Sequence, residues 1–119
     1  MYMASFVAKY DYIRTLAAAS IQVGYTQLGA PVAYPIRLIK VKNLTDADLL
    51  FTMDTSEDQF IIPSRTGEVI DVTSNTFNTN LTGIFAFPIG TTFYVKQVSY
   101  EAPGTGSVWV EVIYGSEQQ

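Results

Sequence analysis

The sequence predicts an all-β fold: a single-domain antiparallel β-sandwich, jelly-roll-like, with about eight strands. Three observations support this prediction. The 119 residues match the length of one ordinary domain. No stretch of the chain shows a helical hydrophobic repeat of useful length. Much of the chain is instead rich in Val, Ile, Thr, Tyr and Phe, interrupted at short intervals by Gly, Pro, Asn and Asp, which is typical of many short strands.

The clearest predicted strand runs from Ser107 to Tyr114. Its residues alternate strictly between two faces, and one face includes a polar residue, which indicates a strand with one buried side. The apolar face consists of Val108, Val110, Val112 and Tyr114, and the opposite face of Trp109, Glu111 and Ile113. We therefore expect the first face to form part of the core.

Two shorter segments, residues 49–53 and 60–62, show the same alternation. The residues that share the apolar face in each segment are Leu49, Phe51, Met53, Phe60 and Ile62. Between Ile36 and Asn43 the alternation changes phase near Leu38-Ile39. A phase change has two explanations that stay open here: a β-bulge, or a strand that is covered on both faces.

Polar segments and segments with Gly or Pro separate these strands and predict turns. They are Asn43–Asp46, Asp54–Asp58, Pro63–Gly67, Pro88–Gly90 and Pro103–Gly106. The Asn-x-Thr sequons at Asn43 and Asn80 are interpreted as turn chemistry too, because we find no secretion signal. We expect a strand or arm over residues 1–20 that can dock on a neighbour, a sandwich domain over residues 21–115 and a frayed tail over residues 116–119.

The composition excludes several classes of function. The net charge is −4, and basic residues gather only at Arg37, Lys40 and Lys42, so the chain lacks the footprint that nucleic-acid binding needs. No apolar run reaches the length of a membrane span. We therefore expect neither a nucleic-acid partner nor a membrane partner. The chain contains no Cys and no His, which removes disulfides, thiolate metal sites and the usual general base.

The acidic segments Asp46–Asp48 and Asp54–Asp58 are the candidates for a metal site, because oxygen-rich loops can hold Ca²⁺. Their spacing is not that of an EF-hand, and Asp is a standard turn residue, so we interpret them as turns and expect no metal and no cofactor. Asp48 and Asp71 form a nominal glycosidase pair of very low specificity. No Ser-x-x-Lys motif or phosphate-binding loop is present. We expect no catalytic residues, and hence a protein that is not an enzyme.

Trp109 stands out among the aromatic residues, because it lies opposite the predicted core face and beside Glu111. Another part of the chain can cover it, most simply the N-terminal segment from Tyr2 to Ile13. A neighbouring subunit can equally well cover it, since Trp is the residue type most enriched among binding anchors. Trp109, Glu111 and Ile113 are therefore our candidate interface residues. A chain that is 48% apolar and 15% charged also predicts self-association into a homo-oligomer.

The segment from Arg37 to Gly115 resembles a group of small β-sandwich structural proteins of tailed-bacteriophage virions. The features that resemble the group are Ile36-Arg37, Asn43–Asp46, the Ser56/Asp58 turn, Phe60–Pro63, Asp71–Asn75, Gly90-Thr91, Tyr94–Lys96, Gly106–Val110 and Ile113–Gly115, with Gly24–Gly29 upstream. The resemblance implies a protein that decorates or cements the capsid, or sits at the head–tail junction or on the tail. It carries over no catalytic residue.

The sequence thus leads to the hypothesis of a non-enzymatic virion protein that is assembled in the host cytoplasm. Its expected partners are other copies of itself and other virion proteins, such as capsid, connector or tail subunits. An alternative from another class is a carbohydrate-binding, lectin-like module, because jelly-roll folds commonly host lectins. Exposed aromatic residues beside Asp or Asn loops would be the feature of that alternative.

Overall fold

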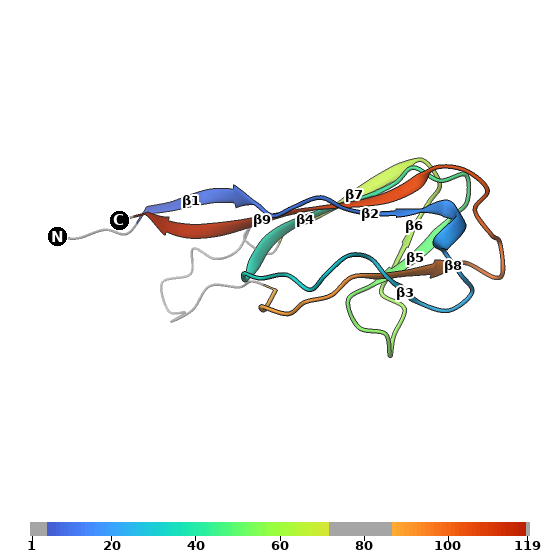
Figure 1. The fold of residues 1–119 in the computed structure, drawn as a ribbon, viewed down its shortest axis with the longest axis horizontal. Helices are drawn as coiled ribbons and strands as arrows, with labels where there is room; N and C mark the ends of the chain where they lie inside the picture. Colours follow the sequence, from blue (N-terminus) through green and yellow to red (C-terminus); the bar gives the residue numbers. More distant parts are fainter. Residues whose placement is uncertain (1–4, 72–86, 119) are drawn as a thin grey trace.

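The computed structural model describes residues 5–71 and 87–118 of the 119-residue chain, and the side chains of residues 9–71 and 87–114 (Figure 1). The Asn80 sequon and the part of the Asp71–Asn75 motif that follows Asp71 lie outside these ranges. The described residues form nine strands and one turn of 3₁₀ helix. They are β1 Ser5–Tyr10, β2 Arg14–Ala17, η1 Ala18–Ser20, β3 Thr26–Gln27, β4 Ile36–Asn43, β5 Leu49–Thr52, β6 Phe60–Ile62, β7 Thr66–Asp71, β8 Tyr94–Gln97 and β9 Ser107–Gln118.

The strands form two antiparallel sheets, which lie one above the other in Figure 1. Sheet A has the order β1–β9–β4–β7, with β2 beside β1 along the same edge of β9, and sheet B has the order β3–β8–β5–β6. The ladders β2–β9, β3–β8, β4–β7 and β5–β6 pair the first half of the chain with the second half in reverse. This is a long hairpin wound into two sheets, the topology of a jelly roll with eight strand positions. The predicted fold class is confirmed.

The core lies between the two sheets and contains the predicted apolar face of β9. Val108, Val110 and Val112 are each at most 1% exposed. They face Leu49 and Phe51 of sheet B within one hydrophobic cluster. Burying each of these side chains stabilises the fold by about 1.5–3 kcal/mol, so the strict alternation of the sequence is what assigns the inner face.

A β-bulge explains the phase change in β4. Ile36 pairs with Tyr114 and Leu38 pairs with Ile113, so Arg37 is the extra residue, one position before the predicted site. The bulge allows Ile36 and Ile39 to be buried together, each at 0% exposure. Of the two explanations that the sequence left open, the bulge is therefore confirmed.

Both chain ends meet along β9. The strand β1 pairs with the last six residues of β9, from Tyr10 opposite Ile113 to Ser5 opposite Gln118. The expected arm thus contains two strands, β1 and β2, that pair with their own chain. Residues 116–118, expected as a frayed tail, continue β9, because the ladder with β1 provides partners for their backbone groups.

Candidate functional site

The outward side of sheet A contains all three predicted interface residues. Residues directly opposite each other in a ladder share a face, so the register places the neighbours of Trp109, Glu111 and Ile113 on β9. We call this surface the outer A face and define it by Trp109, Glu111 and Ile113 together with the residues opposite them on successive strands, which are Tyr10, Thr15, Leu38, Lys40, Lys42, Gly67, Val69 and Asp71. Five of these eleven residues have large apolar or aromatic side chains, and the face as a whole draws on five strands.

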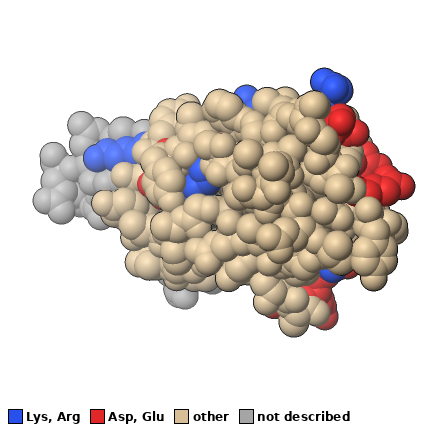
Figure 2. Space-filling model, turned by 45° about the vertical axis from the view of Figure 1, so that its right-hand side comes forward, with Lys and Arg blue, Asp and Glu red and all other residues tan. Residues whose placement is uncertain are grey.

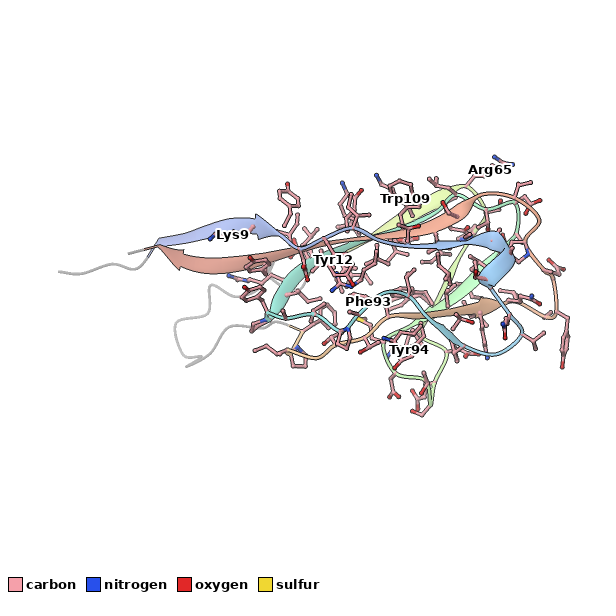
Figure 3. All side chains as sticks on the ribbon, in the orientation of Figure 1. Lys9, Tyr12, Arg65, Phe93, Tyr94 and Trp109 are labelled. Carbon is pink, nitrogen blue, oxygen red and sulfur yellow. The ribbon has the colours of Figure 1, made fainter. Side chains whose placement is uncertain are left out.

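Trp109 points away from the core. Figure 3 shows it on the side of sheet A opposite to Phe93, which lies between the sheets. Its neighbours in the ladders are Thr15 and Lys42, and its indole Nε1–H donates a hydrogen bond to the hydroxyl of Ser107 at 2.6 Å. The polar atom of the indole is thus satisfied, while the ring itself stays only half-buried. An indole in this state can add apolar contact area to an interface without leaving an unpaired donor.

The N-terminal segment does not cover this face within the described residues. The strands β1 and β2 lie beside β9 as edge strands of the same sheet, and nothing in the described chain lies above sheet A (Figure 1). The outer A face is therefore open in the described part of the chain. Coverage of Trp109 by a neighbouring subunit stays a prediction.

Glu111 is the charged centre of the outer A face. Its Oε1 lies 3.3 Å from Nζ of Lys42, and its Oε2 lies 3.9 Å from Nζ of Lys40. The two lysine side chains are 43% exposed and that of Glu111 is 24% exposed. Solvent screens such pairs, so each contributes about 0–1 kcal/mol to folding. The main effect of these ion pairs is that Glu111 offsets positive charge of the two lysines, which lowers the desolvation cost of covering the face.

The rim of the outer A face is strongly exposed and apolar. Tyr10 is 75% exposed and Val69 is 58% exposed, while Leu38 and Ile113 between them are partly buried. Protein–protein contacts are enriched in aromatic residues, as this face is, and depleted in charged residues at their centres, so a partner would have to accommodate Glu111 and its two lysines. This surface, rather than a cleft, is the candidate functional site.

The acidic segments serve as turn anchors. Asp46 Oδ1 accepts hydrogen bonds from the N–H groups of Gly104 at 2.7 Å and Thr105 at 3.2 Å, and these bonds lower the pKa of Asp46. Asp54 Oδ1 accepts from the N–H of Ser56 at 3.0 Å and from its hydroxyl at 2.8 Å, which likewise lowers the pKa of Asp54. The turn interpretation is confirmed for Asp54, whose bonds stay within its own turn, whereas Asp46 joins the turn after β4 to the loop before β9.

The sequon residue Asn43 has a turn role as well. Its buried side-chain amide donates to the carbonyls of Ala47 and Ile62, each at 2.9 Å, and its Oδ1 accepts from the N–H of Thr45 at 3.0 Å. Asn43 therefore joins the turn after β4 to the end of β6, as the turn interpretation predicts.

The structure separates Asp48 from Asp71. Asp48 Oδ1 accepts the N–H of Ser64, just before β7 begins, whereas Asp71 ends β7 opposite Leu38. The length of β7 puts about 17 Å between its two ends. Glycosidase carboxylates lie no more than about 10 Å apart, so these two cannot act as a pair. Within residues 5–71 and 87–118, no group of three or more His, Cys, Asp or Glu residues is placed to hold a metal ion.

No sequence pattern marks Arg14, yet its side chain is wholly buried. Its Nε donates to the carbonyl of Ala30 at 2.8 Å, and one Nη lies 3.1 Å from a carboxylate oxygen of Asp11. The guanidinium carbon lies 4.1 Å from the centre of the Tyr12 ring. The Tyr12 hydroxyl in turn accepts the N–H of Ala30 at 2.7 Å. Arg14 thus anchors β2 to the segment before β4, which is a structural role.

Sheet B has its own polar cluster of Tyr25, Asp58 and Lys96. The Tyr25 hydroxyl donates to Asp58 Oδ1, and Lys96 Nζ lies 3.2 Å from the same oxygen and 4.5 Å from the centre of the Tyr25 ring. Burial and the negative charge of Asp58 raise the pKa of Tyr25 well above its usual value. The hydrogen bonds from Tyr25 and Lys96 lower the pKa of Asp58. The three groups satisfy one another and tie the loop after β5 to β8.

Comparisons with known proteins add no further direction. The described residues include no helix with the length and apolar character that a bilayer crossing requires. No protein-family model, no curated protein and no solved structure matches the chain.

Proposed function

We propose that this chain is a non-enzymatic structural protein of a tailed-phage virion, which acts through protein–protein contacts. Its place would be that of a capsid decoration or cement protein, or of a head–tail or tail accessory protein. The sequence resemblance from Arg37 to Gly115 motivates the proposal. The jelly-roll topology is compatible with it, because this fold occurs in viral capsid proteins.

The observation that carries the proposal is the open outer A face. A half-buried indole, exposed apolar side chains and the paired charges of Glu111 and its lysines lie together on the outward side of one sheet. Covering such a surface gains apolar burial and leaves few polar groups to be satisfied by the partner. A surface of this kind supports assembly by contact area, which is how a building block works.

The distribution of charge gives further support. Figure 2 shows a face on which most of the surface belongs to uncharged residues, with acidic side chains gathered toward one end and at the bottom. Interface centres are depleted in charged residues, so low surface charge favours contacts with other proteins. The carboxylates of Asp46, Asp48 and Asp54 hold turns together instead of converging on a reactive centre.

The experiment is quantitative mass spectrometry of purified phage particles from cells that carry this gene. We expect the chain at a fixed copy number per particle. We expect Trp109→Ala to weaken the free energy of binding to the particle by about 2 kcal/mol or more, the threshold for an anchor residue, and thereby to reduce incorporation. The isolated variant should still fold. Tyr100→Ala is the matched control, because Tyr100 is 80% exposed and lies outside the outer A face. Absence of the chain from purified particles overturns the proposal.

A lectin-like module is the second candidate, because the outer side of sheet B presents aromatic and polar groups together. Tyr94 lies opposite Gln27 in the ladder with β3, and Lys96, on the same side of β8, belongs to the cluster with Tyr25 and Asp58. Aromatic rings beside hydrogen-bonding groups suit a sugar ring. A glycan array with the wild type and Tyr94→Ala decides this: specific binding that the variant loses favours the lectin, and no binding rejects it.

A further inference from the structure

The longest strand extends beyond the body of the sandwich. The first residue of β4 lies opposite Tyr114, so from Gly115 onward β1 is the only strand that pairs with β9 in the described chain. Figure 1 shows β1 and the end of β9 projecting together from one end of the molecule. We call this pair of segments, Ser5–Tyr10 and Ile113–Gln118, the β1–β9 ribbon.

A ribbon of two strands is marginally stable by itself in water. The outer edge of β1, and that of β9 from Gly115 onward, carry main-chain N–H and C=O groups that no strand of the described chain pairs. Adding a strand from another molecule would satisfy one of these edges and stabilise the ribbon, which is the principle of β-augmentation. The ribbon therefore has the properties of a docking element.

The opposite edge of the same sheet offers a matching strand. In the order β1–β9–β4–β7, the strand β7 ends sheet A, and all its residues except Ile70 are exposed. Four successive antiparallel strands also make β7 run opposite to β1. A second copy added in the same orientation would thus place its β7 antiparallel to β1, with no change of direction.

The charges on the two strands, and the side of the sheet on which they lie, favour β1–β7 pairing over β1–β1 pairing. The strand β1 contains Lys9 and no acidic residue, while β7 contains Glu68 and no basic residue. Lys9 lies opposite Tyr114 and Glu68 lies opposite Val41, so both are on the inward side of sheet A and would share a face in a continuous sheet. Pairing β1 with a second β1 would instead bring like charges together.

We propose that copies of this chain join head to tail, with β1 of one copy adding to the β7 edge of the next. The outer A faces then form one surface that runs from Tyr10 of one copy to Val69 of the next. Such a heterologous contact generates a ring, or an open helix where the rotation does not close. This inference deepens the proposed function and rests on it, because it names the partner and the edges through which the building blocks meet.

The chain contains no Cys, so engineered cysteines report this contact without background. The full chain is made as two variants, Lys9→Cys and Glu68→Cys, which are mixed and treated with a short bis-maleimide that tolerates an offset of two residues. We expect a covalent dimer in the mixture at a yield at least about tenfold above that of either variant alone. Each variant alone carries its cysteine at only one of the two edges, so its contact places no second cysteine within reach. Efficient cross-linking of Lys9→Cys with itself identifies β1–β1 pairing and overturns the inference.

Charge reversal tests the same contact without a cross-linking reagent. Lys9→Glu and Glu68→Lys should each raise the dissociation constant for self-association about three- to tenfold, and mixing the two variants should restore mixed association. Thermal melts of each variant check that folding is intact. A wild type that stays monomeric at all concentrations by sedimentation overturns the inference.

The outcomes separate the two proposals. A monomer that is nevertheless found in purified particles rejects the head-to-tail contact and leaves the virion function standing. A head-to-tail assembly of a chain that is missing from particles rejects the virion function alone.

Discussion

Two ionic clusters of sheet A differ in burial and therefore in role. Arg14 is wholly enclosed between β2 and the segment before β4, and its partners are three carbonyls, a carboxylate and two aromatic rings. Glu111 lies on the outer A face between Lys40 and Lys42, and all three side chains are partly exposed. Both clusters contain a cation beside a carboxylate, and they differ in how far water reaches the charges.

The comparison shows how the fold divides its polar contacts. A buried charge must be satisfied completely, because removing its partner leaves desolvated groups without compensation. An exposed pair stays in contact with water and contributes little to folding. The Arg14 cluster should therefore determine stability, while the Glu111 cluster leaves the surface ready to be covered.

Arg14→Met should lower the free energy of unfolding by about 3 kcal/mol, measured by urea denaturation. The substitution removes the charge and leaves the carbonyls of Ala30 and Tyr12 without their donor. Lys40→Met is the matched control on the exposed cluster and should change the free energy of unfolding by less than about 1 kcal/mol. Equal effects of the two substitutions would contradict the division between the clusters.

Gly29→Ala should destabilise the protein by about 1–3 kcal/mol through the same buried cluster. Gly29 has a φ of 78°, and a Cβ atom there would lie 2.5 Å from Cγ of Arg14. Gly24→Ala is the control, because a Cβ atom at Gly24 meets nothing within 4 Å. Thermal denaturation of both variants decides the matter, and a neutral Gly29→Ala would mean that the Arg14 side chain can move aside.

The agreement between the predicted and the observed inner face of β9 shows why strict alternation along a strand is informative. The inner face of β9 was predictable, because one strictly alternating strand can bury only one set of side chains. The phase change near Leu38-Ile39 indicated the bulge, although its position at Arg37 follows from the pairing with Ile113 and not from the sequence of β4 alone. Pairing over long sequence separations has no local signal.

The same reason limits the prediction of the sites. Trp109 and its outward neighbours were predictable as one face, since all three lie on one strand. The cluster of Arg14 with Ala30 was not, because residues 16 positions apart meet only through the tertiary fold. The cluster of Tyr25, Asp58 and Lys96 joins three distant segments and was equally inaccessible to pattern analysis.

Asp46 should make the stability of the protein depend on pH on the acidic side. Hydrogen bonds from Gly104 and Thr105 lower the pKa of Asp46 in the folded state below its value in the unfolded chain. The contribution is therefore fully present above the unfolded pKa, near 4, and is lost as the pH falls through the folded pKa. Urea denaturation of the wild type and Asp46→Asn between about pH 3 and pH 6 should show a shallower decline in the variant. Parallel declines would contradict the anchoring role of this carboxylate.

Glu111→Gln should have the smallest effect on folding, a change of at most about 1 kcal/mol in the free energy of unfolding. The glutamine keeps the shape of the side chain and loses the charge that balances Lys40 and Lys42. Salt screens the exposed pairs, so the difference from the wild type should shrink as the ionic strength rises. Self-association should respond more strongly, because covering two uncompensated lysines costs desolvation energy that the free chain does not meet. Urea denaturation at two salt concentrations, beside sedimentation of the same variant, measures both quantities. A loss of more than 2 kcal/mol from folding with unchanged association would place Glu111 in the same class as Arg14, and the outer A face would then be a closed part of the fold.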